Sequence, residues 1–190
     1  MAGTAEVTGR VARCALLATV YVAGALLGLS FDPVSDFAAL VWPASGLALA
    51  ALVLGGRGLW PGVAAGAPAA NLWAGWSLEP QVHPLVAVGI AAGNTAGALL
   101  GAWLLERARV RPALDRLRDV VVFIGLAGLA STLVSPSVGA LSLWLGGHLD
   151  LAGVPTTWRA WWVGDAIGVL IVTPVVLAWA TARRERGRLV

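Results

Sequence analysis

The sequence contains no lysine and has little charge of either sign. Only 12% of its 190 residues are charged, 58% are hydrophobic, and the mean hydropathy is +0.82. Soluble domains carry about twice this share of charged residues and cannot bury so much apolar surface. The composition therefore excludes an ordinary soluble domain and predicts an integral membrane protein. The ten tryptophans agree, because their amphipathic rings favour the membrane–water boundary.

Several kinds of chemistry are excluded by what is missing. Cys14 is the only cysteine, which excludes an internal disulfide and a zinc site built on paired cysteines. There is no Gly-x-Ser-x-Gly, His-Glu-x-x-His or Gly-Lys-Ser/Thr motif. Asp165 is the only acid well inside an apolar run, so one chain cannot form an aspartate pair for intramembrane proteolysis. We therefore predict a protein that is not an enzyme, with no metal site and with no cofactor indicated.

Six apolar runs account for most of the chain. A transmembrane helix needs about 20 apolar residues, and the runs cover residues 11–29, 37–54, 59–76, 85–105, 120–145 and 158–180. The predicted fold is an all-α, polytopic transmembrane helix bundle with about six spans, and residues 1–190 form one domain. We interpret the first run as a retained helix rather than a cleaved signal peptide.

The arginines predict the orientation of these spans. Twelve of the thirteen lie at the chain ends or in alternate links if the fifth run crosses once, and only Arg159 lies on the other side. Positive charge is typical of the cytoplasmic side, so both termini are predicted to be cytoplasmic. Arginine gathered at the ends of apolar runs is a topology pattern, so no nucleic-acid partner is predicted. Ser135-Pro136-Ser137 predicts a kink or break in the fifth span.

Two runs carry small residues at four-residue spacing. These are Gly89, Gly93, Gly97 and Gly101 in the fourth run, and Gly62, Gly66 and Ala70 in the third. Such stripes allow two helices to approach closely. We expect the third and fourth helices to pack tightly, and helix packing is the favoured role of the stripes.

Polar residues inside the apolar runs are the candidate functional residues, because each is costly in hydrocarbon unless partnered. We place Asp165 about two turns inside the outer end of the sixth span and expect the polar groups to converge in the outer half. A cavity there is predicted to bind a small ligand through Asp165, Asn94, Asn71, Trp42, Ser45, Trp162, Ser137 and Arg159. Alternatively, the asparagines and serines only bond one another across helices. Arg159 could pair with Asp165, or with Asp32, Asp36 or Glu79 in the outer links.

Short motifs along the chain suggest a family. They are Trp42-Pro43-Ala44-Ser45-Gly46, Ala70-Asn71-Leu72, Gly93-Asn94-Thr95, Arg118-Asp119, Trp161-Trp162-Val163-Gly164-Asp165 and Thr173-Pro174. In this order and spacing, from about residue 12 to 179, the chain resembles the membrane-associated sensor (MASE) domain of the first type. Trp42, Pro43, Gly46, Asn71, Asn94, Trp162, Gly164, Asp165, Gly168 and Pro174 then occupy recurring positions of that family.

The resemblance implies the membrane-embedded sensory part of a bacterial signalling protein. Such domains usually precede a cytoplasmic histidine kinase, diguanylate cyclase or phosphodiesterase. The implied location is the bacterial inner membrane. The implied partners are the lipid bilayer, a cytoplasmic signalling partner or output domain and an unidentified small ligand, with a homodimer left open. No output module follows Arg188, so a stand-alone member and an excised sensory part are both open.

Three hypotheses for function follow. The first is a non-enzymatic sensory domain that responds to a small ligand or to a membrane state. The second is a small-molecule transporter or substrate-capture subunit, because six spans with a broken helix and polar groups near the midplane also suit transport. The third is a structural subunit that assembles with another membrane protein.

Overall fold

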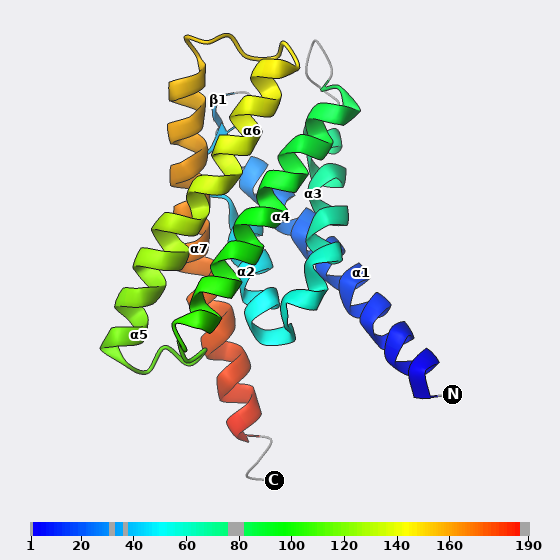
Figure 1. The fold of residues 1–190 in the computed structure, drawn as a ribbon, viewed down its shortest axis with the longest axis vertical. Helices are drawn as coiled ribbons and strands as arrows, with labels where there is room; N and C mark the ends of the chain where they lie inside the picture. The colour runs from blue at the N-terminus through cyan, green and yellow to red at the C-terminus, as the bar shows by residue number, and fades with distance from the viewer. Residues whose placement is uncertain (1, 31–32, 36–37, 76–81, 187–190) are drawn as a thin grey trace.

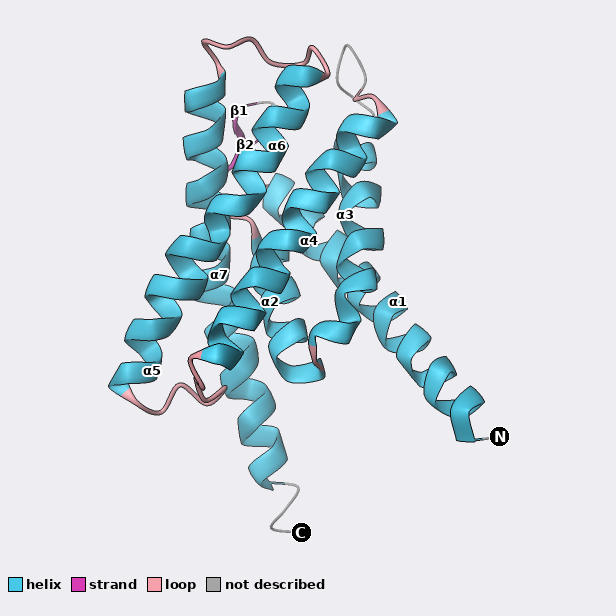
Figure 2. Ribbon diagram, viewed as in Figure 1, coloured by secondary structure: helices cyan, strands magenta, loops and turns pink. Residues whose placement is uncertain are grey.

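Helices account for nearly all of the described chain, as Figure 2 shows. The computed structural model describes all residues except 1, 31–32, 36–37, 76–81 and 187–190. The elements are α1 (Ala2–Leu29), β1 (Pro33–Ser35), β2 (Ala38–Ala39), α2 (Pro43–Gly55), η1 (Arg57–Leu59), α3 (Trp60–Gly75), α4 (Pro84–Arg107), α5 (Leu117–Val122), η2 (Phe123–Ala130), η3 (Ser131–Leu133), α6 (Val134–Leu145) and α7 (Val154–Arg186). Strands β1 and β2 form one short antiparallel pair.

Four helical stretches of the described chain are long and apolar enough to cross a bilayer. They lie within α1, α4, the continuous run Leu117–Leu145 and α7. With 13 and 16 residues, α2 and α3 are only about 20 and 24 Å long, against a hydrocarbon thickness of about 30 Å. The predicted helical membrane bundle is thus confirmed, while the count of six full spans stays a prediction.

The second run differs from its prediction as a helix over residues 37–54. Phe37 lies outside the described residues, the chain before Pro43 contains β2, and the helix begins only at Pro43. Proline is favoured in the first turn of a helix and disfavours helical geometry in the preceding residue. Trp42 accordingly has φ −117° and ψ 84°. The start of α2 is therefore fixed by its own sequence.

The fifth run contains the predicted irregularity. A π-helical segment, η2, and a 3₁₀ turn, η3, separate α5 from α6, and Pro136 is the third residue of α6. The break thus begins well before the proline. The hydroxyl of Ser131 donates to the Ala127 carbonyl oxygen at 2.9 Å, and that of Thr132 donates to Gly128 at 2.8 Å. These bonds supply local partners to backbone carbonyls in the irregular segment.

The two glycine stripes do not face each other, although α3 and α4 are neighbours. A Cβ atom on Gly93 would lie 2.8 Å from Cβ of Val138 in α6, and one on Gly66 would lie 2.9 Å from the Ala18 carbonyl oxygen in α1. The stripe of α4 therefore packs against the α6 side, and that of α3 against α1. The third and fourth helices are thus neighbours, as predicted, but they do not meet through their small residues. Spacing shows that a helix face is smooth, not which helix covers it.

Both termini lie at the same end of the bundle (Figure 1). The turn η1 and the loop between α4 and α5 lie there too. We call this the arginine-rich end, since it also carries residues 107–118. The opposite end holds the loop between α6 and α7 and the start of α4. This arrangement agrees with the predicted placement of the two termini on one side, while their cytoplasmic orientation stays a prediction.

Candidate functional site

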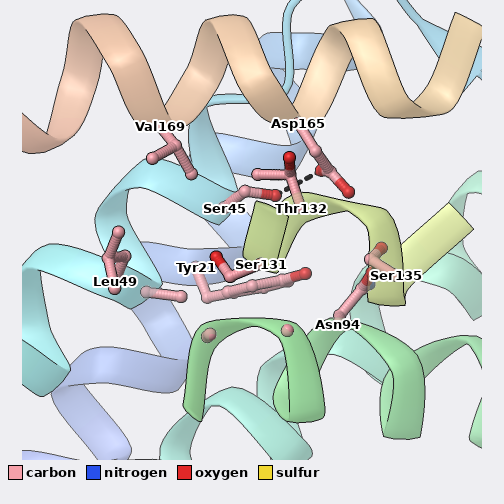
Figure 3. A pocket seen from close by; sticks show the side chains of 12 residues that line it. Tyr21, Ser45, Leu49, Asn94, Ser131, Thr132, Ser135, Asp165 and Val169 are labelled. Atoms are coloured by element: carbon pink, nitrogen blue, oxygen red, sulfur yellow. Dashed lines mark hydrogen bonds between the residues drawn. The ribbon is translucent and has the colours of Figure 1, made fainter. Parts of the chain in front are cut away.

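A small buried cavity with several polar side chains in its lining lies among five helices of the described chain (Figure 3). Its volume is about 20 Å³, close to that of one water molecule. Seven polar residues line it, and five of them form what we call the midplane cluster: Tyr21 of α1, Ser45 of α2, Asn94 of α4, Ser135 of α6 and Asp165 of α7. Each of these five helices thus contributes one polar side chain of the cluster to the cavity lining.

The cluster lies near the middle of the bundle. Asp165 follows the first residue of α7, Val154, by 11 positions, and Asn94 follows Pro84 by 10. At 1.5 Å per residue these residues lie about 15–17 Å from the end opposite the arginine-rich end. Because α7 begins at Val154 rather than near residue 158, Asp165 lies about three turns deep instead of two.

Two hydrogen bonds connect helices within the cluster. The Ser45 hydroxyl donates to Oδ1 of Asp165 (dashed in Figure 3), and the Ser135 hydroxyl donates to Oδ1 of Asn94 at 2.5 Å. Tyr21 points its hydroxyl toward Asn94 and Ser135 in the same view. Only 1% of Asp165 and 8% of Asn94 is exposed. These inter-helix contacts are therefore buried inside the bundle.

Two polar atoms at the cavity have no hydrogen-bond partner in the described structure. They are Oδ2 of Asp165 and the hydroxyl of Tyr21. A buried polar group without a partner costs about 1–3 kcal/mol, and more if it is charged. Such groups in native proteins call for a bound water, an ion or a functional role. The cavity next to them is large enough for one such particle.

The first turn of α2 is held directly against the middle of α7. The Trp42 backbone N–H donates to the Gly164 carbonyl at 3.0 Å, and the Thr173 hydroxyl donates to the Gly46 carbonyl at 3.0 Å. A Cβ on Gly168 would lie 2.0 Å from the Trp42 carbonyl oxygen, so only glycine fits there. Ser45 is the third residue of α2 and contacts Asp165. Asp165 therefore lies at the positively polarised N-terminus of this short helix.

Comparison with known protein families identifies the family of the chain. The family model named MASE1, a membrane-associated sensor domain, matches residues 13–189. The chain belongs to the MASE1 family. No curated protein and no solved structure matches the chain. MASE1 is a sensory domain of signalling proteins, so a sensory role in a membrane is the general function of this chain.

Three of the residues predicted from the sequence line the cavity of this MASE1 domain. They are Asp165, Asn94 and Ser45. Trp42 is the residue before α2, and its indole Nε1 is buried without a partner in the described structure. Asn71 lies near the end of α3, away from the cavity lining, and its Nδ2 likewise has no partner there. Binding of a ligand by these residues stays a prediction.

Trp162 and Ser137 join α7 to the irregular helix instead of lining the cavity. The Trp162 indole donates to the Thr132 hydroxyl at 3.2 Å and to the Leu129 carbonyl at 3.3 Å. Trp158 stacks on Trp162 with 6.0 Å between ring centroids, and it donates to the Ser137 hydroxyl at 3.1 Å. These contacts hold α7 against the irregular part of the run Leu117–Leu145, on both sides of Pro136.

Arg159 is exposed and forms no ion pair with Asp165. The six positions between the two residues put them on different faces of α7, which explains their separation. The other expected partners, Asp32, Asp36 and Glu79, lie in segments whose side chains are outside the described residues. Arg159 thus belongs to the surface near one end of the bundle rather than to the cluster.

Other lining residues were not singled out from the sequence as ligand-binding. They are Tyr21, Ser131, Thr132 and Ser135. Tyr21 is the only tyrosine in the chain, and its position inside the first apolar run was a usable signal. The three hydroxyl residues of the fifth run were ambiguous, since serine and threonine often bond their own helix. Ser131 and Thr132 do so here, whereas Ser135 reaches Asn94.

Two larger hollows lie elsewhere in the described structure. One of about 430 Å³ lies between α3 and α4 and is walled mainly by alanine and other apolar side chains. One of about 490 Å³ lies near the arginine-rich end, beside the Arg57–Glu106 ion pair of 3.0 Å. Neither combines buried, unpartnered polar atoms with side chains from several helices, so the midplane cluster is the stronger candidate site.

Proposed function

We propose that this MASE1 domain receives its signal at the midplane cluster and passes it along α7 to the arginine-rich end. One observation carries the proposal. Asp165, a carboxyl group in the middle of a membrane bundle, meets the start of the short helix α2 rather than a basic side chain. An ionisable group at this depth is costly to keep, which favours a functional role over simple packing.

The geometry of α7 supports transmission. It has 33 residues and is about 50 Å long, so it extends beyond a hydrocarbon core of about 30 Å. Asp165 lies in its first half, and Pro174 lies further along. Proline removes one helix hydrogen bond and permits bending there. A displacement at Asp165 therefore has a continuous helix through which to reach Arg183.

The size of the cavity limits the signal. A volume of about 20 Å³ holds one water-sized particle and no organic molecule in the described conformation. The signal is then a very small ligand, or a membrane state that rearranges the cluster. In either case it must act unequally on two arrangements of the bundle in order to switch it.

A reporter fusion tests this function. A diguanylate cyclase is fused to the C-terminus of the chain, and cyclic di-GMP is measured in bacteria. Asp165→Asn and Ser45→Ala each alter the cluster, and we expect them to change output by about fivefold or more, the range of ordinary coupling energies. Asp150→Asn is the matched control, because Asp150 is exposed and an asparagine keeps the oxygen that accepts from the Gly153 N–H at 2.8 Å. Equal output from all four proteins, at equal membrane levels, refutes the proposal.

Transport is the second candidate, and a helix too short to cross the bilayer, α2, that begins beside a midplane carboxyl is the observation that favours it. Uptake of radiolabelled solutes into proteoliposomes separates the two. Transport requires net solute accumulation that Asp165→Asn abolishes, whereas the sensory function requires a change in reporter output without net uptake.

A further inference from the structure

The midplane cluster contains a buried carboxyl group with no basic side chain paired to it. Asp165 is 1% exposed, Ser45 donates to its Oδ1, and its Oδ2 has no hydrogen-bond partner in the described structure. The ion pairs found in that structure involve Arg57, Arg111 and Arg118, and none involves Asp165. A buried carboxylate requires a counter-charge or a proton, because its desolvation is otherwise too costly.

The start of α2 supplies part of that counter-charge. A helix N-terminus acts as roughly half a positive charge on groups near its first turn. Ser45 lies in that turn and touches Asp165. About half a negative charge is left over, together with the unpartnered Oδ2.

The remaining lining offers oxygen atoms. These are the Ser45 and Ser135 hydroxyls, Oδ1 of Asn94 and the unpartnered Tyr21 hydroxyl. Carboxylate, amide and hydroxyl oxygens suit hard cations, while no thiolate or imidazole lines the cavity. A single carboxylate matches a monovalent ion better than a divalent one. The described residues accordingly contain no group of three His, Cys, Asp or Glu side chains placed to hold a metal.

From these observations we propose that the cavity binds one sodium ion. The ion lies against Oδ2 of Asp165 and takes further oxygens from Ser45, Asn94, Ser135 and Tyr21. It balances the carboxylate, and the cavity has room for one such ion. The few oxygens of the lining suit sodium better than potassium, which needs more of them. This inference rests on the proposed function, since sodium is then the ligand that the sensory domain reports.

Sodium binding is tested on the purified 190-residue chain in lipid nanodiscs. Thermal unfolding is followed by the fluorescence of the ten tryptophans. NaCl replaces choline chloride at constant ionic strength and pH. A ligand that binds only the folded state raises Tm by mass action, so we expect an increase that grows with the logarithm of sodium concentration and reaches about 3–5 °C at ten times Kd. KCl is expected to give less than a third of this shift.

Variants connect the shift to the cavity. Asp165→Asn removes the charge and is expected to abolish the sodium-dependent shift, whereas Asp150→Asn retains it. Ser135→Ala keeps the carboxyl group and removes one oxygen, and it is the second variant to use if Asp165→Asn does not fold. It is expected to raise the Kd for sodium by about tenfold.

Three outcomes overturn the inference. They are equal Tm values in sodium, potassium and choline, a Tm that follows pH but not sodium (a proton or a water in the cavity), and a sodium shift that survives Asp165→Asn and Ser135→Ala. These outcomes leave the sensory function standing if the same variants still alter reporter output. If the sodium shift depends on the cluster but reporter output does not, the sensory function fails and the ion is structural.

Discussion

Single missing Cβ atoms set how closely α2 approaches α7. A Cβ on Gly46 would lie 2.2 Å from the Gly168 carbonyl oxygen, and one on Gly168 would lie 2.0 Å from that of Trp42. Both neighbours are backbone atoms that cannot rotate away. The contact that presents Ser45 to Asp165 therefore depends on two glycines that no motif for catalysis or binding would select.

Gly168→Ala tests this contact. The added methyl group forces α2 away from α7, so we expect a loss of about 3 kcal/mol or more in the free energy of unfolding. Gly125→Ala is the matched control, because a Cβ there meets no atom within 4 Å, and it should be neutral or slightly stabilising. Reversible thermal unfolding in detergent gives both values. Equal stability of the two variants would show that the close approach is not needed.

Thr173→Val tests the second bond between these helices. Thr173 is fully buried and its hydroxyl donates to the Gly46 carbonyl, so its removal should cost about 1–2 kcal/mol. Thr181→Val removes a hydroxyl that bonds only to carbonyls of its own helix, Leu177 and Ala178. We expect less than about 0.5 kcal/mol for it. A larger loss of stability from Thr181→Val than from Thr173→Val would contradict a stabilising role for the Thr173–Gly46 bond.

Sequence reasoning succeeded at the residue scale where one polar group stood alone in an apolar run. Asp165 and Asn94 were selected in this way, and both line the cavity. The hydrogen bond between Trp162 and Thr132 was not predicted, because the two residues lie 30 positions apart. An indole is also common at the membrane–water boundary, where it needs no partner in the protein. Long-range pairing of this kind is set by packing and leaves no local signal.

Among the elements, the irregular ones surround the cluster. The π-helical η2, the 3₁₀ turn η3 and the start of α2 all lie near it, while α4 is regular throughout. Pro43 and Pro136 made interruptions predictable, since proline restricts both itself and the residue before it. The π-helical segment Phe123–Ala130 was not predictable, because its residues are ordinary helix formers or glycine.

At the arginine-rich end, the loop between α4 and α5 depends on one buried acid. Asp119 is 1% exposed, accepts from the Arg111 backbone N–H at 3.3 Å and pairs with Arg118 at 3.2 Å. Asp119→Ala leaves the N–H without this partner, so we expect a loss of about 2–3 kcal/mol in thermal unfolding. Glu106→Gln is the control. Its pair with Arg57 is exposed and should be worth less than about 1 kcal/mol. If both changes cost the same, Asp119 does not anchor the loop.

For the whole molecule, hydropathy and arginine placement predicted the helical bundle and a common end for both termini. These features follow from the bilayer as solvent and need no knowledge of contacts. The half-depth start of α2 was missed, because apolar residues continue across it and hydropathy does not distinguish a helix from other buried backbone. Which helix packs against each helix face could likewise not be predicted from the sequence.

Cysteine labelling tests the orientation. Cys14 is the only cysteine, so Cys14→Ala gives a clean background. We expect Leu151→Cys, in the loop before α7, to react with a membrane-impermeant maleimide in spheroplasts. Ala113→Cys, in the loop after α4, should react only after permeabilisation. Both positions are exposed. The reverse pattern would invert the predicted orientation, and reaction of both in intact spheroplasts would contradict the placement of these two loops on opposite sides of the membrane.

The central claim is that the midplane cluster and the far end of α7 are coupled. Hydrogen–deuterium exchange of the chain in nanodiscs measures this directly at residues 177–186, about 18 Å or more along the helix from Asp165. The account predicts that Asp165→Asn changes exchange there while Asp150→Asn leaves it at the wild-type level. Identical exchange at this end in all three proteins, with the bundle intact, would contradict it.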